Sequence, residues 1–259
     1  LKNLNILNCQ ITYKGSTSLI YSVEGKIKNC NIQTMKLNSS NSTNETLQGA
    51  FTSKLTGNME NCTATDIEII NNNTYSIHIG GLAGFIAKSE IKNCFVTGLK
   101  VNIEKGNVYV GIGGIVGYES DVSKITNCIA EGSINADGDN IGGIAGKIKV
   151  SSNIENSISK VNITGSSDVL GGIVGIKEDT VSSVINNLSL GNLYSSKNGI
   201  QGKSIIHSGT DNINNNYYYE GQKINGISVG KKDYGSLSYN ELKDLNTYCL
   251  LYTSPSPRD

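Results

Sequence analysis

The stretch from Gly113 to Ile134 reads GGIVGYESDVSKITNCIAEGSI, and it contains both motifs that decide the fold. The first motif is a Gly-Gly segment that begins at Gly113. The second is an apolar residue, any residue, an asparagine and a small residue, here Ile125-Thr126-Asn127-Cys128. Both motifs recur along the chain at intervals typical of stacked repeats, so a repeat array is expected.

The asparagine motif occurs eight times, with its asparagines 21 to 34 residues apart. Asparagine tolerates the left-handed backbone conformation better than other non-glycine residues, so a single asparagine can bend a strand without a long loop. We therefore expect an asparagine at each bend, a hydrogen-bonded ladder of these side chains on successive coils, and an inward-pointing cysteine after each. Ser157 and Leu188 are expected to replace the cysteine in two later copies. The motif residues are Asn8, Asn29, Asn61, Asn93, Asn127, Asn156, Asn187 and Asn215, with Cys9, Cys30, Cys62, Cys94 and Cys128.

The Gly-Gly motif occurs four times, each time shortly before the next asparagine motif. Because glycine lets another backbone approach closely, these segments are expected to be strands that build a thin, flat wall. Glycine-rich strings that bind phosphate open a helix, whereas a polar turn follows here, which disfavours a nucleotide site. The glycine pairs are Gly80 and Gly81, Gly113 and Gly114, Gly142 and Gly143, and Gly171 and Gly172.

Strands are favoured over helices throughout the chain. Apolar and polar residues alternate in segments such as 161–164, and no segment keeps a helical period for three turns. The hydrophobic residues are mostly Ile, Val and Leu, which also favours strands. We therefore predict an all-β protein, a parallel β-helix or β-solenoid with seven to eight coils of about 30 residues. Each coil is expected to have three short strands: one with Gly-Gly, one that ends at the motif asparagine and one that follows it.

The composition excludes two classes of partner. The chain has 259 residues, of which 17% are charged, and its formal net charge is zero. It therefore lacks the basic excess that holds a nucleic-acid backbone. No apolar run approaches the roughly 20 residues of a membrane span, so we expect no membrane insertion in this segment.

Residues 1–248 are expected to form one solenoid array, with clear repeats at about 80–175, weaker repeats on both sides and the array end at about 213–248. The last stretch, CLLYTSPSPRD at 249–259, differs in composition because it holds both prolines and the only arginine. It matches the translation of a transposase-based sequencing adapter. We therefore expect 249–259 not to be native protein and the chain to be a fragment truncated at both ends; a natural proline-rich tail is the alternative.

Groups that could carry chemistry are few. Cysteines that recur at one repeat position favour packing over reactivity, although disulfides between adjacent coils stay open because the strand spacing suits their Cα separation. Zinc needs a tetrahedral ligand set, and no C-x-x-C occurs. The two histidines, His78 and His207, do not form H-E-x-x-H. We predict no catalytic residue, no metal site and no cofactor.

Acidic residues near the Gly-Gly segments are candidate calcium ligands or glycosidase carboxylates. Stacked turns could align them for Ca²⁺, but Lys147 and Lys149 lie at the matching turn of the intervening coil, which favours solvated loops. Glycoside cleavage needs paired carboxylates in matched geometry on one face, and nothing in the sequence indicates that. Tyrosines 217–219 are expected to cover the end of the core, with sugar stacking as the alternative. The acidic residues are Glu119, Asp121, Asp137, Asp139, Glu178 and Asp179.

The strings GGLAG, GGIVG, GGIAG and GGIVG, which begin at residues 80, 113, 142 and 171, resemble the GLUG motif, named for its Gly-Leu-any-Gly core. Asn216–Tyr219 and Ser238–Asp244 are similar to the end of GLUG arrays. The resemblance implies a bacterial surface or secreted protein; such repeats also accompany immunoglobulin-A-specific metallopeptidases as non-catalytic segments. Residues 1–70 and 199–202 depart from the Gly-Gly pattern.

The expected function is therefore a non-catalytic structural or adhesive segment of a cell-surface or extracellular protein, acting as a rigid spacer or a binding surface. Host or matrix glycans and proteins are the candidate partners. One alternative is a non-catalytic arm of a large secreted metallopeptidase, which predicts a zinc-protease motif elsewhere in the gene. Another is a carbohydrate-active β-helix enzyme, which predicts several carboxylates on one outer face.

Overall fold

The structure is a computed structural model and describes residues 1–40, 42, 44–107, 110–166, 169–196, 202–209, 211–228 and 236–243. The 249–259 stretch, for which a non-native origin is predicted, lies outside the described residues. So do Gly199, Ile200 and Gln201 of the weak Gly-Gly segment.

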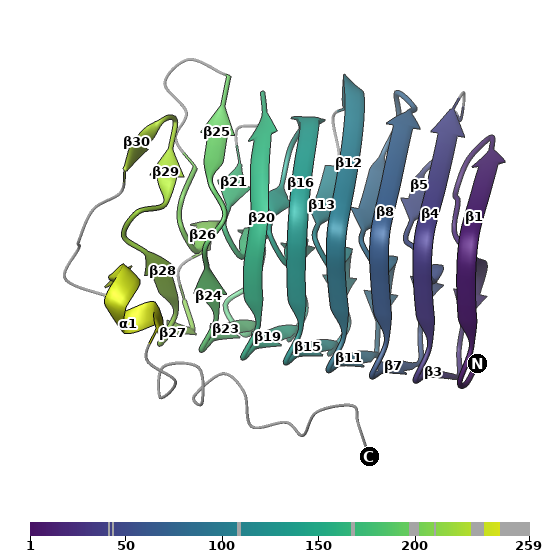
Figure 1. Cartoon of the computed structure of the whole chain (residues 1–259), viewed down its shortest axis with the longest axis horizontal. Helices are drawn as coiled ribbons and strands as arrows, with labels where there is room; N and C mark the ends of the chain where they lie inside the picture. The colour runs from purple at the N-terminus through teal and green to yellow at the C-terminus, as the bar shows by residue number, and fades with distance from the viewer. Residues whose placement is uncertain are drawn as a thin grey trace.

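The predicted fold class is confirmed: the chain is an all-β parallel β-solenoid of about six turns (Figure 1). Its broad face is a twelve-stranded sheet, here called the long sheet, in which the strands pair in parallel with their equivalents one coil away, apart from the antiparallel pair of β29 and β30. The path through this sheet runs β1 (Asn5–Tyr13), β4 (Asn31–Ser40), β8 (Thr63–Asn72), β12 (Phe95–Asn107), β16 (Ile129–Gly138), β20 (Ile158–Gly165), β24 (Leu188–Ser189), β28 (Tyr217–Tyr219) and β31 (Ser236–Leu237), with β25 (Leu193–Ser195), β29 (Lys223–Ile224) and β30 (Ile227–Ser228) beside it.

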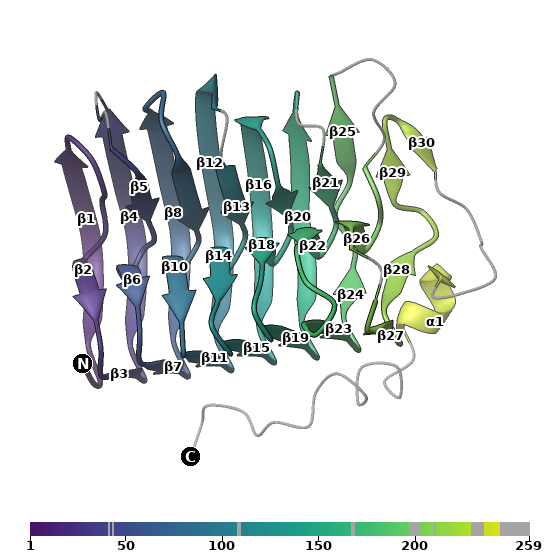
Figure 2. The ribbon, with the colours of Figure 1, turned by 180° about the vertical axis from the view of Figure 1, so that it is seen from behind.

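The chain then enters the glycine sheet, a five-stranded sheet in which four strands end at the first glycine of a Gly-Gly pair. Next comes the return sheet of seven strands, which faces the viewer in Figure 2. The glycine sheet contains β5 (Thr46–Gln48), β9 (Ile77–Gly80), β13 (Val110–Gly113), β17 (Ile141–Gly142) and β21 (Leu170–Gly171), and the return sheet contains β2 (Ile20–Val23), β6 (Thr52–Leu55), β10 (Ala83–Ala87), β14 (Val116–Ser120), β18 (Ala145–Ile148), β22 (Val174–Lys177) and β26 (Ile206–Ser208).

The asparagine sheet, with seven short strands that end just before the motif asparagines, closes each coil. After it the chain bends into the next long strand. Helix α1 (Tyr239–Lys243) follows the last strand of the long sheet. The asparagine sheet contains β3 (Lys26–Lys28), β7 (Asn58–Glu60), β11 (Glu90–Lys92), β15 (Lys124–Thr126), β19 (Asn153–Glu155), β23 (Ser183–Ile185) and β27 (Ile213–Asn214).

A complete coil therefore has four strands, and the prediction of three is wrong. The Gly-Gly segment was expected to be one strand, but it divides into two at the pair itself, as in β9 and β10. The predicted seven to eight coils are also too many. The five-stranded glycine sheet has two strands fewer than the seven-stranded sheets, since at its two ends there are only isolated bridges, Thr17 with Gln48 and Gly171 with Lys203.

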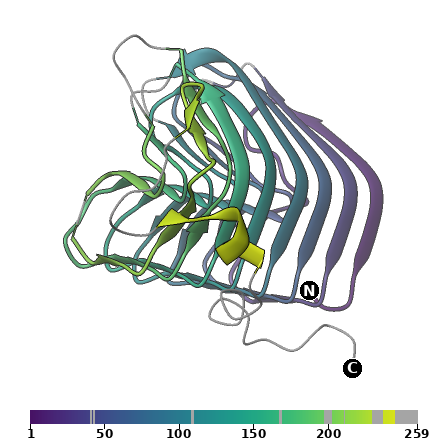
Figure 3. The same cartoon turned by 60° about the vertical axis from the view of Figure 1, so that its left-hand side comes forward.

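The core is a single apolar cluster enclosed by the stacked coils (Figure 3). Alternation in the strands places one side chain inside and the next outside, as in β20, where Val161 and Ile163 are buried and Lys160 and Asn162 are exposed. In-register pairing then stacks like upon like, for example Ile125 on Ile91 and Ile154. As a result, each coil buries its apolar residues against the coils on both sides.

Candidate functional site

Asparagine occupies the sharp bend between the asparagine sheet and the long sheet. At six predicted positions φ lies between 52° and 54°, in the left-handed region where asparagine is less strained than other non-glycine residues. The bend lets a three-residue strand turn into a long strand without a loop. The six residues are Asn29, Asn61, Asn93, Asn127, Asn156 and Asn215.

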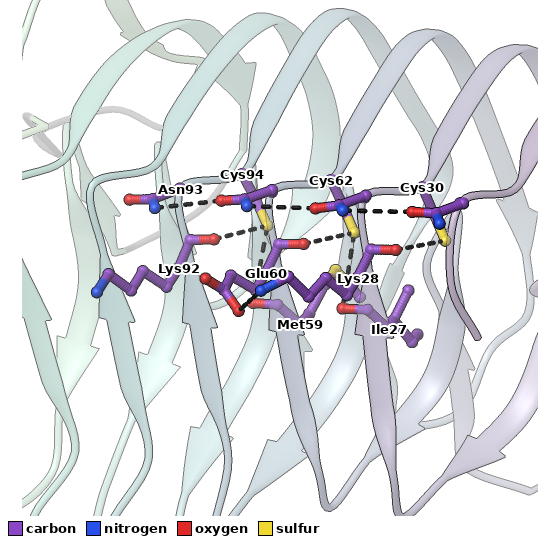
Figure 4. Close-up of polar contacts among 12 residues, drawn as sticks. Ile27, Lys28, Cys30, Met59, Glu60, Cys62, Lys92, Asn93 and Cys94 are labelled. Atoms are coloured by element: carbon purple, nitrogen blue, oxygen red, sulfur yellow. Dashed lines mark hydrogen bonds and ion pairs between the residues drawn. The ribbon is translucent and has the colours of Figure 1, made fainter. Parts of the chain in front are cut away.

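The bend asparagines of neighbouring coils form a hydrogen-bonded ladder. The Nδ2 atom of Asn61 donates to Oδ1 of Asn29 at 3.3 Å, and Asn93 donates to Asn61 at 3.2 Å (Figure 4). Asn127 continues the ladder by donating to Asn93 at 3.2 Å. Each rung uses one amide hydrogen and one amide oxygen, so the ladder ties coils together along their outer corner.

The placement of Asn187 at this bend is wrong by one residue. Val184 pairs with Ile154, so the bend residue is Asn186, with φ of 58°. Asn187 takes the inward position that cysteine holds in earlier coils, and its Nδ2 donates to the Ile154 carbonyl at 3.0 Å. Leu188, predicted to replace cysteine, therefore points outward.

Asn8 and Cys9 also lie elsewhere than predicted. Cys9 pairs with Met35, not with Cys30. Asn8 belongs to a second bend, within the long strand, where Thr34, Asp66 and Gly98 follow it in later coils with φ between 55° and 64°. The first rung of the corner ladder is Asn3, with φ of 53°, whose Oδ1 accepts from Asn29 at 3.3 Å. The 21-residue spacing between Asn8 and Asn29, shorter than every other interval, was the available signal.

The cysteines after the bend point inward and stack. Cys30, Cys62, Cys94 and Cys128 are at most 2% exposed. Each thiol donates to the carbonyl two residues earlier, as from Cys94 to Lys92 at 3.2 Å. Ser157 makes the equivalent bond to the Glu155 carbonyl at 3.0 Å. The position therefore selects small side chains with a hydrogen to donate.

These thiols are poorly suited to chemistry. All five cysteines among the described residues are free. Burial raises the pKa of Cys94 well above its usual value. The hydrogen bond with Cys94 lowers the pKa of Cys62, but that side chain is also fully enclosed. A buried neutral thiol is inert, since the thiolate is the nucleophile and the metal ligand.

The Gly-Gly pairs form a corner instead of the predicted flat wall. A Cβ on Gly80 would collide with the carbonyl of Ala83, across the bend of its own coil. A Cβ on Gly81 would collide with the carbonyl of Gly114 in the next coil, and one on Gly114 would meet Gly143 in the same way. The first glycine thus allows the tight turn, and the second allows the turns to stack. Gly113, Gly142, Gly171 and Gly172 make the equivalent close approaches.

Glu119 points into the core, and its interpretation as part of a solvated loop is wrong. It lies in β14, fully buried, stacked between Ile86 and Ile148. Neither carboxylate oxygen has a hydrogen-bond partner. Burial, followed by the nearby Cys128 thiol, raises the pKa of the Glu119 carboxyl well above its usual value, which favours the protonated form.

The other acidic residues are dispersed. Glu178 forms ion pairs with Lys147 at 2.7 Å and Lys149 at 3.6 Å. Asp179 accepts hydrogen bonds from the Ser182 backbone and hydroxyl at 2.6 Å and 2.8 Å. Asp137 accepts one from the Ser166 hydroxyl at 2.7 Å. Across the described parts of the chain, no three His, Cys, Asp or Glu residues form a group that could hold a metal ion.

His78 lies on the outer side of the glycine sheet but is only 7% exposed. Its ring packs 5.1 Å from that of Tyr118, and its Nε2 is 3.3 Å from Oε1 of Glu45. The hydrogen bond from His78 lowers the pKa of Glu45. Its contacts thus fasten the glycine sheet to the return sheet. His207, by contrast, lies in β26.

The tyrosine cluster divides between two faces. Tyr218 is 6% exposed and takes the inward register position of Ser189. Tyr217 lies over the outer face of the long sheet, against Leu188. In the described ranges, no helix is long and apolar enough to cross a membrane.

Comparison with known proteins supports the resemblance. Residues 75–102 match the sequence profile of the GLUG motif, and these residues run from β9 through the Gly80–Gly81 corner and the Asn93 bend into β12. Among solved structures, a putative immunoglobulin A1 protease from Bacteroides ovatus is similar with a TM-score of 0.63 and 24% identity, covering 95% of this chain and 70% of that chain. An IgA1 protease is similar with a TM-score of 0.58 and 16% identity, covering 98% of this chain and 20% of that chain. No curated protein matches.

Proposed function

We propose that this chain is a non-catalytic structural segment of a bacterial cell-surface or secreted protein. Its coils would hold a neighbouring domain, or a binding face for host or matrix glycans or proteins, at a fixed distance. The observation that carries this proposal is the parallel pairing of equivalent strands from coil to coil in all four sheets. A solenoid of this kind offers an extended surface in which each coil contacts only its neighbours.

Contacts on the outer corners support stiffness. Lys28 pairs with Glu60 at 3.0 Å, and Lys124 pairs with Glu155 at 2.7 Å, in each case across one coil boundary. Such exposed ion pairs contribute little singly, about 0–1 kcal/mol. Together with the Asn29–Asn61–Asn93 ladder, they oppose sliding and bending of one coil against the next.

Stiffness can be tested by distance measurement between the ends of the array. Spin labels would be attached to keto amino acids at Tyr21 and Val181, which are each 63% exposed and belong to early and late coils. Electron–electron resonance should give one narrow distance distribution. A broad or multiple distribution would contradict the spacer function, because the array would then bend between its ends.

A second candidate is a non-catalytic arm of a secreted peptidase. The likeness to two structures described as IgA1 proteases favours it, although the chain spans only 20% of one of them. Sequencing the coding region on both sides of the chain tests this candidate. An in-frame H-E-x-x-H motif would support the peptidase arm, and an anchor signal without any such motif would favour the surface spacer.

A further inference from the structure

An apolar file runs across the outer face of the long sheet. Cys128, just before β16, and Ala130 within it point inward, so Ile129 between them points outward. Its register partners in later coils are also apolar, although outward positions elsewhere in this sheet hold residues such as Lys160 and Asn162. The file consists of Phe95, Ile129, Ile158, Leu188 and Tyr217.

Two members of the file are buried although they lie outside the solenoid. Ile158 is 3% exposed and Leu188 is 1% exposed. They form a second hydrophobic cluster, separate from the core, in which Leu237 of β31 and Leu242 of α1 pack against them. The residues at the C-terminal end of the described chain therefore cover an outer face, in addition to extending the long sheet.

The segment Ser236–Lys243, here called the strap, is held in place at its turn. Ser236 and Leu237 pair with Tyr218 and Tyr219 at the end of the long sheet. The Ser238 backbone nitrogen then donates to the Glu241 carboxylate at 2.7 Å, and the Glu241 backbone nitrogen donates to the Ser238 hydroxyl at 3.3 Å. This reciprocal pair is a capping box, which starts α1 and directs it back over the file.

The strap is too short to be stable without that contact. Helix α1 has five residues, and isolated helices shorter than about 12–15 residues are marginal in water. Tyr239, Asn240 and Glu241 are exposed, whereas Leu242 is half-buried against the cluster. The apolar contact of Leu237 and Leu242 with the file therefore stabilises the helix on the outer face of the long sheet.

We propose that the outer apolar file is a docking track and that the strap is its occupant, a lateral latch that clips the last coils to those before them. A segment that covered only the end of the solenoid would protect the final coil alone. The strap instead packs against the cluster formed by Leu188 and Ile158, which lie in strands two and three positions back along the long sheet from β31. Opening the last coil would therefore also require lifting the strap from earlier strands.

The test is hydrogen exchange of the whole chain, followed peptide by peptide. Leu242→Ser should accelerate exchange in β28 and β31 by roughly ten- to hundredfold, the range expected when the burial of a leucine side chain is lost, and leave β4 and β8 unchanged. Asn240→Ser, on the exposed side of the same helix, is the matched control and should change nothing.

A second pair of variants tests the track itself. Ile158→Thr keeps a β-branched residue in the strand but removes the apolar contact, and it should free the strap as Leu242→Ser does. Phe95→Thr, in the same file but outside the cluster with the strap, should leave β31 protected. Unchanged exchange of β31 in both Leu242→Ser and Ile158→Thr would overturn the latch, and so would loss of protection throughout the chain.

Discussion

Asn93 donates a hydrogen bond from its side-chain nitrogen to the side-chain oxygen of Asn61 at 3.2 Å, and both residues have φ of 53°. One residue type thus satisfies two needs at the same place. The left-handed backbone makes the corner, and the amide links that corner to the next. Because this bend and its hydrogen bond recur in successive coils, the coils stack on one another.

Replacement of Asn93 separates the two roles. Asn93→Gly removes the ladder bonds but suits a positive φ, so it should cost about 1 kcal/mol of unfolding free energy. Asn93→Ala also places an unsupported Cβ in the left-handed region and should cost about 1–2 kcal/mol more. Urea denaturation of the two variants measures the difference. Equal losses would mean that backbone strain contributes nothing at this corner.

Glycine at the second position of the pair is predicted to be required by stacking. A Cβ on Gly114 would lie 2.6 Å from the Cβ of Ala130 and collide with the carbonyl of Gly143. Gly114→Ala should therefore cost about 3 kcal/mol or more, the upper range for overpacking. Gly25→Ala is the matched control, because a Cβ there meets nothing within 4 Å. The midpoint of thermal unfolding should fall for Gly114→Ala and stay unchanged for Gly25→Ala. Similar falls in both variants would contradict the stacked corner.

Glu119 should make stability depend on pH. Its folded pKa is raised above the ordinary value of 4.5. Above that value the unfolded chain releases this proton and the folded chain retains it, so the unfolding free energy should fall as pH rises from about 4.5 towards the folded pKa.

Glu119→Ile matches Ile86 and Ile148 in the same file of the core. It should raise stability at pH 7 by about 1–4 kcal/mol, because an unpaired buried polar group is removed. It should also flatten the decline of the unfolding free energy with rising pH, which chemical denaturation at several pH values from 4 to 8 would measure. Glu178→Gln, at a partly exposed ion pair, should retain the decline. A variant Glu119→Ile with an unchanged pH slope would place the titrating group elsewhere.

The stacked cysteines should resist alkylation in the folded protein. Cys30, Cys62, Cys94 and Cys128 are enclosed, whereas Cys9 is partly exposed. Iodoacetamide followed by peptide mass mapping should modify Cys9 first and the other four only after denaturation. Early modification of Cys94 would show that the coils open at this corner under native conditions.

The sequence predicts the kind of structure more securely than its register. Period-two alternation and repeated asparagines suffice for strands and left-handed bends, because both follow from local sterics. They do not tell one bend from another. Asn8 and Asn29 carry the same Asn-Cys pair, yet the first lies within the long strand and the second at the corner. Only pairing along the whole coil distinguishes them.

Features that depend on the neighbouring coil could not be predicted. Gly81 is required because the Gly114 carbonyl approaches it, and no pattern within one repeat contains that contact. Glu119 is buried beside Ile86 and Ile148 although Val116, three residues earlier, also belongs to the core, so β14 departs from strict alternation. Ile158 points outward yet is buried, in a cluster against which Leu242, 84 residues later in the chain, packs.

Deletion of one complete coil tests the central claim most directly. Removing residues 94–127 joins Asn93 to Cys128, so the corner motif is kept and the strands on either side of the deletion can pair with their equivalents. If each coil contacts only its neighbours, the shortened chain should still fold as an all-β protein. Its longest dimension, measured by small-angle X-ray scattering, should be shorter by about 4.8 Å, one strand spacing. A protein that fails to fold, or that folds without becoming shorter, would contradict the account.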